Sequence, residues 1–103
     1  MGIFSFLGFG GNKVKDALLK GAAVIDVRTV NEYDGGKVPG SINIPVERIA
    51  SSIDRLKGMR RPLVFCCTSG SRSGKAVSIA KQNGIKEVYN GGSWLQVLKL
   101  LNS

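Results

Sequence analysis

The sequence predicts an α/β fold in which a mostly parallel sheet of about four to five strands carries helices on both faces. Apolar runs of strand type occur at 22–27, 62–66 and 86–90. Segments whose apolar residues recur at helical spacing lie between these runs and after them, and glycines end several of these segments. With 103 residues, of which 43% are hydrophobic, the chain has room for a single core and one domain.

The chain begins with an uncharged segment rich in Gly and Phe, residues 1–11, which we expect to be an arm outside a single domain over 12–103. Asn12 can cap a helix over 13–20, which Gly21 ends before the first strand. The first segment lacks the basic start and the unbroken apolar run of a secretory signal, so we expect a cytoplasmic protein. No apolar run is long enough to span a bilayer, and no membrane partner is expected.

The next elements are short. Thr29 and Glu32 have the spacing of a capping box, which predicts a brief helical turn. The apolar run 41–44 predicts a short strand. Pro45 suits the first turn of a helix, and the helical spacing of the apolar residues that follow predicts one amphipathic helix over 46–56.

The second half contains the most informative join. The strand at 62–66 leads into a loop of small residues and then into a helix over 73–83, followed by a strand at 86–90 and a closing helix over 93–101. Strands separated by helices imply parallel pairing through right-handed crossovers. Because a helix N-terminus offers unpaired N–H groups, the loop before 73–83 is expected to form an anion cradle.

The residue inventory narrows the chemistry. The chain has no His, and its two cysteines, Cys66 and Cys67, are adjacent. A metal site therefore lacks a ligand set, and catalysis by Cys-His or Ser-His-Asp is excluded. A disulfide between neighbours would constrain almost no chain, so we expect both thiols to be reduced. The net charge of +8 favours anionic partners, but the cations are scattered, which does not favour a nucleic-acid groove.

The two cysteines stand at different distances from Arg72. Counting from Cys67 gives C-x4-R, whereas counting from Cys66 gives C-x5-R, the spacing of a phosphate-binding loop. Cys66 fits as the last strand residue, packed against the sheet, and Cys67 as the first residue of the loop. A cradled cysteine is reactive and a buried one is inert, so Cys67 is the candidate nucleophile. The loop expected around it consists of Thr68, Ser69, Gly70, Ser71, Arg72 and Ser73.

Three charged residues at the end of the first strand and just beyond it are candidate supporting groups. They are Asp26, Arg28 and Glu32, and active sites of parallel sheets gather at the carboxyl ends of the strands. For Asp26 and Arg28 we favour a structural role over direct contact with the loop. In that role they form an ion-pair and capping set, in which Arg28 meets Glu32 or Asp26 bonds loop amides. Arg72 could either bind the substrate anion or act as a strut that shapes the loop.

Taken together, these residues resemble the single-domain rhodanese, or thiosulfate sulfurtransferase-like, family over nearly the whole chain. VIDVRTVNEYDGGKVPGSINIP at 24–45 is similar to the leading segment of the family, CTSGSRS at 67–73 to its six-residue active loop, and VYNGGSW at 88–94 to its last strand and Gly-Gly turn. Two positions depart from the pattern. Lys37 stands where the family usually has His, and Thr68 stands where a basic residue is frequent, which leaves the substrate preference open.

The resemblance implies a rhodanese-like three-layer fold and a double-displacement sulfurtransferase. Cys67 would take a sulfane sulfur from thiosulfate or a persulfide donor and pass it to cyanide or a thiol, without a metal or an organic cofactor. A role as a sulfur-relay module for a protein partner, or in thiol redox chemistry, stays open, as do the physiological donor, the acceptor and the oligomeric state. Rhodanese-fold phosphatases and arsenate reductases, whose loop is one residue longer, would use Cys66 instead.

Overall fold

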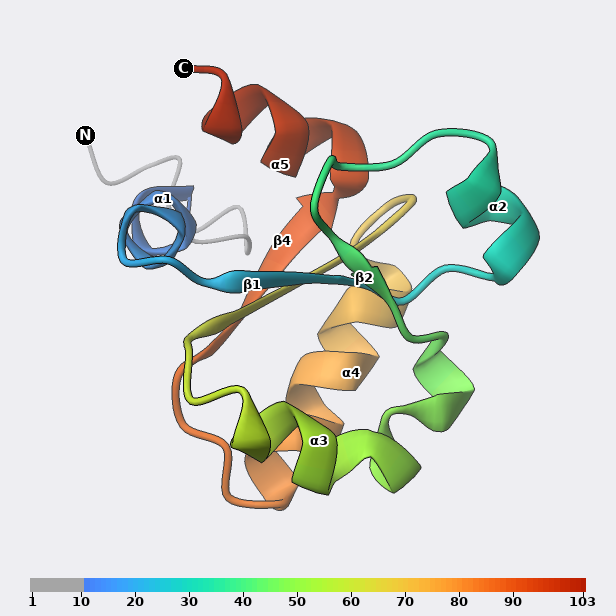
Figure 1. The fold of residues 1–103 in the computed structure, drawn as a ribbon, viewed down its shortest axis with the longest axis vertical. Helices are drawn as coiled ribbons and strands as arrows, with labels where there is room; N and C mark the ends of the chain where they lie inside the picture. Colours follow the sequence, from blue (N-terminus) through green and yellow to red (C-terminus); the bar gives the residue numbers. More distant parts are fainter. Residues whose placement is uncertain (1–10) are drawn as a thin grey trace.

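The computed structural model describes residues 11–103, in which a four-stranded parallel sheet lies between two layers of helices (Figure 1). This arrangement confirms the α/β fold. The strand order is β2-β1-β3-β4. None of the helices in this part of the chain is long and apolar enough to cross a membrane. The elements in chain order are α1 (Gly11–Leu19), β1 (Ala23–Asp26), α2 (Val30–Asp34), β2 (Ile42–Asn43), η2 (Val46–Arg48), η3 (Ala50–Ser52), α3 (Ile53–Gly58), β3 (Leu63–Cys67), α4 (Ser71–Gln82), β4 (Val88–Ser93) and α5 (Trp94–Leu101).

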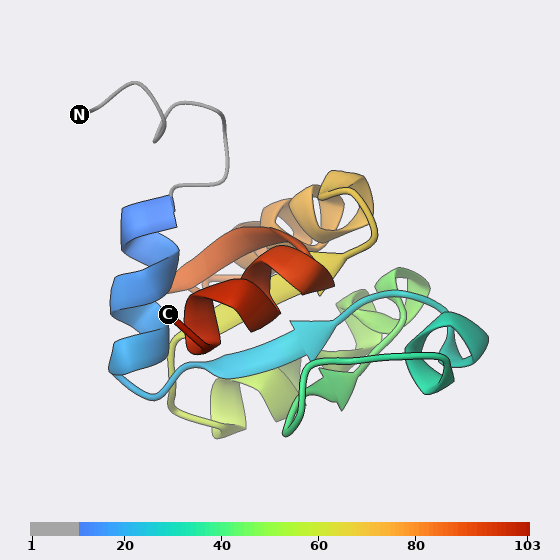
Figure 2. The same ribbon diagram turned by 90° about the horizontal axis from the view of Figure 1, so that it is seen from above.

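Two apolar clusters fill the two faces of the sheet. Helices α1 and α5 cover one face, as the view from above shows (Figure 2), and Val64, Cys66 and Val97 pack there. Helices α3 and α4 cover the opposite face, where Phe65 and Cys67 pack. Because successive side chains of a strand point to opposite faces, the two neighbouring cysteines belong to different clusters.

The N-terminal part of the chain is only partly described. The proposed arm lies outside the described residues except for Gly11, which already belongs to α1. The helix thus begins one residue before Asn12, the expected cap.

The prediction of a single helix over 46–56 is wrong. This segment forms the two 3₁₀ turns η2 and η3 before α3 begins. The hydroxyls of Ser51 and Ser52 donate to the carbonyl of Arg48 at 3.0 and 2.7 Å. Such side-chain bonds compete with the regular backbone pairing of a helix, which accounts for the irregular start.

The join between β3 and α4 is tighter than the sequence indicated. Cys67 is the last residue of β3 and not the first residue of the loop, because it pairs with Ser93 of β4. Helix α4 begins at Ser71, two residues earlier than expected. The loop between the two elements is therefore reduced to residues 68–70.

Strand β4 contains a bulge opposite the end of β3. Phe65 pairs with Asn90 and Cys67 with Ser93, so β4 contains one residue more than β3 over this stretch. Gly91 and Gly92 lie inside the bulge. The strand consequently runs on to Ser93, whereas the sequence predicted its end at Asn90.

Replacement of Gly91 by alanine should destabilise the protein by about 1 to 3 kcal/mol, because the core there has no space for a methyl group. A Cβ at this position would lie 2.7 Å from Val97 Cγ2 and 2.8 Å from Val64 Cγ1. The matched control is Gly58→Ala in α3, where a Cβ would meet nothing within 4 Å and helix propensity favours alanine. Urea unfolding followed by Trp94 fluorescence compares the two, and equal midpoints would contradict the prediction.

Candidate active site

Cys67 lies at the carboxyl edge of the sheet, beside the N-terminus of α4. Its side chain has no exposed surface. Gly70, the residue that precedes α4, has a left-handed backbone with a φ of 98°. Residues with a side chain rarely adopt this conformation, whereas glycine does so freely. The turn directs N–H groups from the start of α4 toward the sulfur of Cys67.

Two backbone N–H groups donate to Cys67 Sγ. The nitrogen of Gly70 lies 3.0 Å from the sulfur and that of Ser73 lies 3.4 Å from it. The Ser73 hydroxyl oxygen is also 3.4 Å away. Burial raises the pKa of the Cys67 thiol, but the hydrogen bonds from Ser73 and Gly70 outweigh burial and hold that pKa below its ordinary value. The site therefore stabilises the thiolate, which is the nucleophilic form.

Asn90 of β4 braces this turn, a role that the sequence analysis missed. Its side-chain nitrogen donates to the carbonyl of Gly70 at 3.0 Å, and its side-chain oxygen accepts from Ser73 Oγ at 2.7 Å and from the nitrogen of Gly92 at 2.9 Å. Because the Ser73 hydroxyl has one proton, it can serve either Asn90 or an ionised Cys67. The only sequence signal for this role is a polar residue inside a strand, next to two glycines.

Cys66 has a contrasting environment. It is fully buried in the cluster beneath α1 and α5. Burial raises the pKa of its thiol above the ordinary value, and the carboxylate of Asp26, its partner in β1, raises that pKa further. A neutral thiol in a packed apolar site is inert. The expectation that Cys66 packs against the sheet is confirmed.

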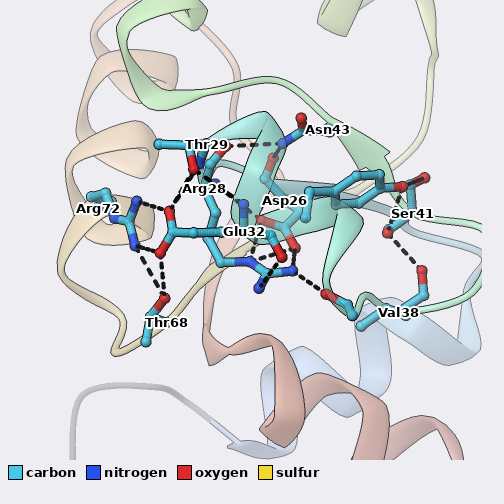
Figure 3. A network of polar contacts seen from close by, with 11 residues as sticks. Asp26, Arg28, Thr29, Glu32, Val38, Ser41, Asn43, Thr68 and Arg72 are labelled. Atoms are coloured by element: carbon cyan, nitrogen blue, oxygen red, sulfur yellow. Dashed lines mark hydrogen bonds and ion pairs between the residues drawn. The ribbon is translucent and has the colours of Figure 1, made fainter.

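A polar clamp, formed by Glu32, Thr68 and Arg72, joins α2 to the loop after β3 (Figure 3). Arg72 Nη1 lies 2.7 Å from Glu32 Oε1, and Arg72 Nη2 lies 3.0 Å from Oε2. Thr68 Oγ1 donates to Glu32 Oε2 at 3.3 Å and accepts from Arg72 Nη2 at 3.1 Å. The hydrogen bond from Arg72 is the main reason why the pKa of Glu32 lies well below its usual range. Of the two roles left open for Arg72, the geometry favours the strut.

The capping box of α2 orients Glu32 for the clamp. The nitrogen of Thr29 donates to Glu32 Oε1 at 3.0 Å, and the nitrogen of Glu32 donates to Thr29 Oγ1 at 3.2 Å. This reciprocal pair confirms the capping box expected from the sequence. One carboxylate thus serves both the start of α2 and the loop that contains Thr68.

A buried ion pair between Asp26 and Arg28 holds α2 and the residues that follow it in place. Arg28 Nη2 lies 2.7 Å from Asp26 Oδ2, and both residues are buried. Arg28 also donates to the carbonyls of Glu32 and Gly36 at 3.2 and 2.6 Å, and its guanidinium carbon lies 4.9 Å from the centroid of the Trp94 ring. Arg28 thus pairs with Asp26 and meets Glu32 only at its backbone carbonyl, so the pair acts on the loop through the position of α2.

Two further residues of the predicted loop, and one position that departs from the family pattern, are exposed to solvent. Ser69 and Ser71 are exposed, in the loop and at the first position of α4. Lys37, which departs from the family pattern, is exposed with its Nζ 4.7 Å from the centroid of the Tyr33 ring.

Comparison with known proteins identifies a family and several relatives. The chain matches the model of the rhodanese-like domain family over residues 12–95. The solved structure of the human single-domain sulfurtransferase TSTD1 is 27% identical, with a TM-score of 0.68 over 85% of this chain and 91% of that one. A rhodanese with anions from E. coli is 29% identical, with a TM-score of 0.68 over 73% of this chain and 89% of that one.

Several curated proteins are more than 30% identical to the chain over about two thirds of its length. The protein YqhL of Bacillus subtilis is 35% identical over 69 residues, which cover 67% of this chain and 54% of that protein. The tRNA uridine(34) hydroxylase of Buchnera aphidicola is 36% identical over 75 residues, covering 68% of this chain and 24% of that enzyme. The thiosulfate sulfurtransferase GlpE of Shewanella oneidensis is 31% identical over 71 residues, with 69% of both chains covered. The chain therefore spans about half of YqhL and a quarter of the hydroxylase.

The hydrogen bonds to Cys67 predict that its thiol ionises at a lower pH than the thiol of Cys66. In the Cys66→Ala variant, the ultraviolet absorbance of the thiolate should appear with a midpoint below that of free cysteine, because N–H donors stabilise the charge on Cys67. In the Cys67→Ser variant, only the buried Cys66 remains, and its thiolate should appear well above that midpoint. The reverse order of midpoints would contradict the assignment.

The lowered pKa of Cys67 also determines how the free energy of unfolding changes with pH. The folded-state pKa of Cys67 lies below the unfolded-state pKa, so the unfolded protein binds more protons between the two values. The contribution of Cys67 to the free energy of unfolding is therefore fully present above the unfolded-state pKa and is lost as the pH falls through the folded-state pKa.

Proposed function

Because the chain belongs to the rhodanese-like domain family, we propose that it is a sulfurtransferase in which Cys67 carries the transferred sulfur as a persulfide. The observation that carries this proposal is the pair of N–H groups that donate to Cys67 Sγ from the start of α4. Relatives named as a thiosulfate sulfurtransferase and as a thiosulfate:glutathione sulfurtransferase support the reaction class.

The proposed reaction has two displacement steps. In the first, the Cys67 thiolate attacks the outer sulfur of thiosulfate or of a persulfide donor. A bond forms between the two sulfurs, the bond from the outer sulfur to the rest of the donor breaks, and sulfite or a thiolate leaves with the electron pair. In the second step, cyanide or a thiolate attacks the outer sulfur of the persulfide, and Cys67 leaves as a thiolate. The N–H groups of Gly70 and Ser73 stabilise its negative charge before and after the cycle.

The loop over residues 68–70 controls access to the sulfur in this proposal. Cys67 is fully buried, while Thr68 and Ser69 above it are exposed. A donor therefore reaches the sulfur only when the loop moves aside. The clamp formed by Glu32, Thr68 and Arg72 fixes one end of the loop, so it sets how far and how often the loop opens.

The alternative readings of the cysteine pair have less support. A phosphatase or arsenate reductase that uses Cys66 needs this sulfur in the loop, yet it packs beneath α1 and α5 with a raised pKa. A sulfur-relay role requires only that the acceptor is a protein thiol, and a relative in Bacillus subtilis is named a putative sulfur carrier protein. We therefore include protein thiols among the acceptors. A purely redox role would instead give a sulfenate on Cys67 with peroxide faster than a persulfide with thiosulfate.

Replacement of the two cysteines tests the proposal. Cys67→Ser should abolish thiosulfate:cyanide sulfurtransfer and should leave the fold intact, because a hydroxyl is near in size to a thiol and far less acidic. Cys66→Ala should keep most of the activity and lose about 1 kcal/mol of stability. Mass spectrometry after thiosulfate treatment should find one added sulfur on Cys67. Sulfur found on Cys66, with hydrolysis of an aryl phosphate, would replace sulfurtransfer by phosphatase chemistry.

The clamp predicts that Arg72 and Glu32 act as one unit. Arg72→Ala and Glu32→Gln should each lower kcat/KM by about tenfold, because each change breaks the same ion pair while glutamine can still accept the N–H of Thr29 in the capping box. The double variant should be no worse than either single variant. Lys37→Ala, which also removes a cation at the surface, is the control and should have little effect. Additive losses, or a large loss confined to Arg72→Ala, would mean that Arg72 binds the donor directly.

A further inference from the structure

A basic cleft lies near the N-terminal ends of β3 and β4, whereas Cys67 lies at the C-terminal end of β3. It has a volume of about 280 Å³, and its charged lining comes from the end of α3 and from the two connections that lead into β3 and β4. Figure 1 shows these connections side by side at the left of the molecule, away from the loop after β3. The cationic residues of the lining are Lys57, Arg60, Arg61 and Lys86, and the apolar ones are Leu56 and Ile85.

Within residues 11–103, no ion pair neutralises the cations of the cleft. In the part of the chain that the structure describes, the ion pairs join Arg28 to Asp26 and Arg72 to Glu32, both at the other edge of the sheet. The cleft contains one carboxylate, that of Glu87, against its four cations. Positive charges held together without partners create a positive electrostatic potential, which attracts anions.

Arg61 is held firmly and provides a fixed wall of the cleft. Its Nε donates to the carbonyl of Gly21 at 2.7 Å, and its Nη2 donates to the carbonyl of Ala22 at 3.2 Å. These bonds tie the start of β3 to the start of β1. They use two of the five N–H donors of the guanidinium, so the others stay available to a ligand.

Arg60 occupies a position that usually belongs to glycine. Its φ is 53°, and it is the only residue other than glycine with a positive φ among those described. The position follows α3 by two residues, where a left-handed backbone ends many helices, and a side chain there costs about 1 kcal/mol. The C-terminus of α3 attracts Lys57 and Arg60, but it does not account for Lys86, which arrives from a different segment.

We propose that this basic cleft binds an anion that carries two or more phosphate groups. The forked guanidinium groups of Arg60 and Arg61 match phosphate oxygens, and the lysines add point charges on either side. Among the described residues, the lining contains no aromatic side chain on which a base could stack, so recognition rests on the phosphates. The cleft lies at the opposite end of the strands from Cys67, so its ligand is distinct from the sulfur donor.

Calorimetric titration of the whole protein with inorganic tripolyphosphate tests the site. The double variant Arg60→Gly with Lys86→Gln should bind at least about tenfold more weakly than the unchanged protein. Glycine at position 60 relieves the left-handed strain, so this variant should remain folded, which thermal unfolding checks. The matched control is Arg48→Gln with Lys99→Gln, which removes the same charge elsewhere and should lower the affinity by less than about threefold. Sulfurtransfer should be unchanged in both double variants.

The results distinguish a small polyphosphate from a nucleic-acid backbone as the ligand, and some of them would overturn the proposal. Binding of tripolyphosphate but not of a single-stranded RNA oligomer assigns the cleft to small polyphosphates. Binding of both, lost together in the cleft variant, assigns it to a nucleic-acid backbone as well. Equal affinity of the two double variants, or no binding of tripolyphosphate at low salt, overturns the proposal. Tighter binding of a polyglutamate peptide than of tripolyphosphate overturns the phosphate assignment.

Discussion

The sulfur of Cys67 serves as the cap of helix α4, and the arrangement of the active edge depends on this interaction. The N-cap residue of α4 is Gly70, which has no side chain to accept an N–H group from the first turn. The third helical residue is Ser73, and its nitrogen donates to Cys67 Sγ instead. The sulfur thus satisfies a donor that the start of a helix leaves unpaired. The same bond stabilises negative charge on the sulfur, so the helix start and the reactivity of the thiol have a common origin.

This capping arrangement places demands on the surrounding strands. The sulfur reaches the first turn of α4 only because β3 continues to Cys67 and the chain then reverses within three residues. The bulge in β4 serves the same turn, since it brings Asn90 to the carbonyl of Gly70 and to the hydroxyl of Ser73. The clamp and the buried pair of Asp26 and Arg28 hold the outer side of the loop through α2. The loop is therefore held by contacts with β4 on one side and with α2 on the other.

The sequence predicted features that depend on local spacing. The order of strands and helices and the capping box of Thr29 and Glu32 follow from residues that are close together in the chain. Features that depend on distant residues were missed or misplaced. The end of β3 is set by pairing with Ser93, and Asn90 acquires its role from a bulge whose only local mark is the pair Gly91 and Gly92. The ion pair that favours a strut role for Arg72 involves Glu32, which is 40 residues away.

The register of β3 explains why two identical side chains differ in chemistry. Neighbouring residues of a strand point to opposite faces, and a shift of one residue would exchange the environments of Cys66 and Cys67. At Cys67, hydrogen bonds from the start of α4 overcome the effect of burial on the pKa. At Cys66, burial and the nearby Asp26 carboxylate raise the pKa. The face that a cysteine occupies, rather than its distance along the chain from Arg72, decides which thiol can react. The spacing to the arginine is informative only because pairing with β1 and β4 fixes that face.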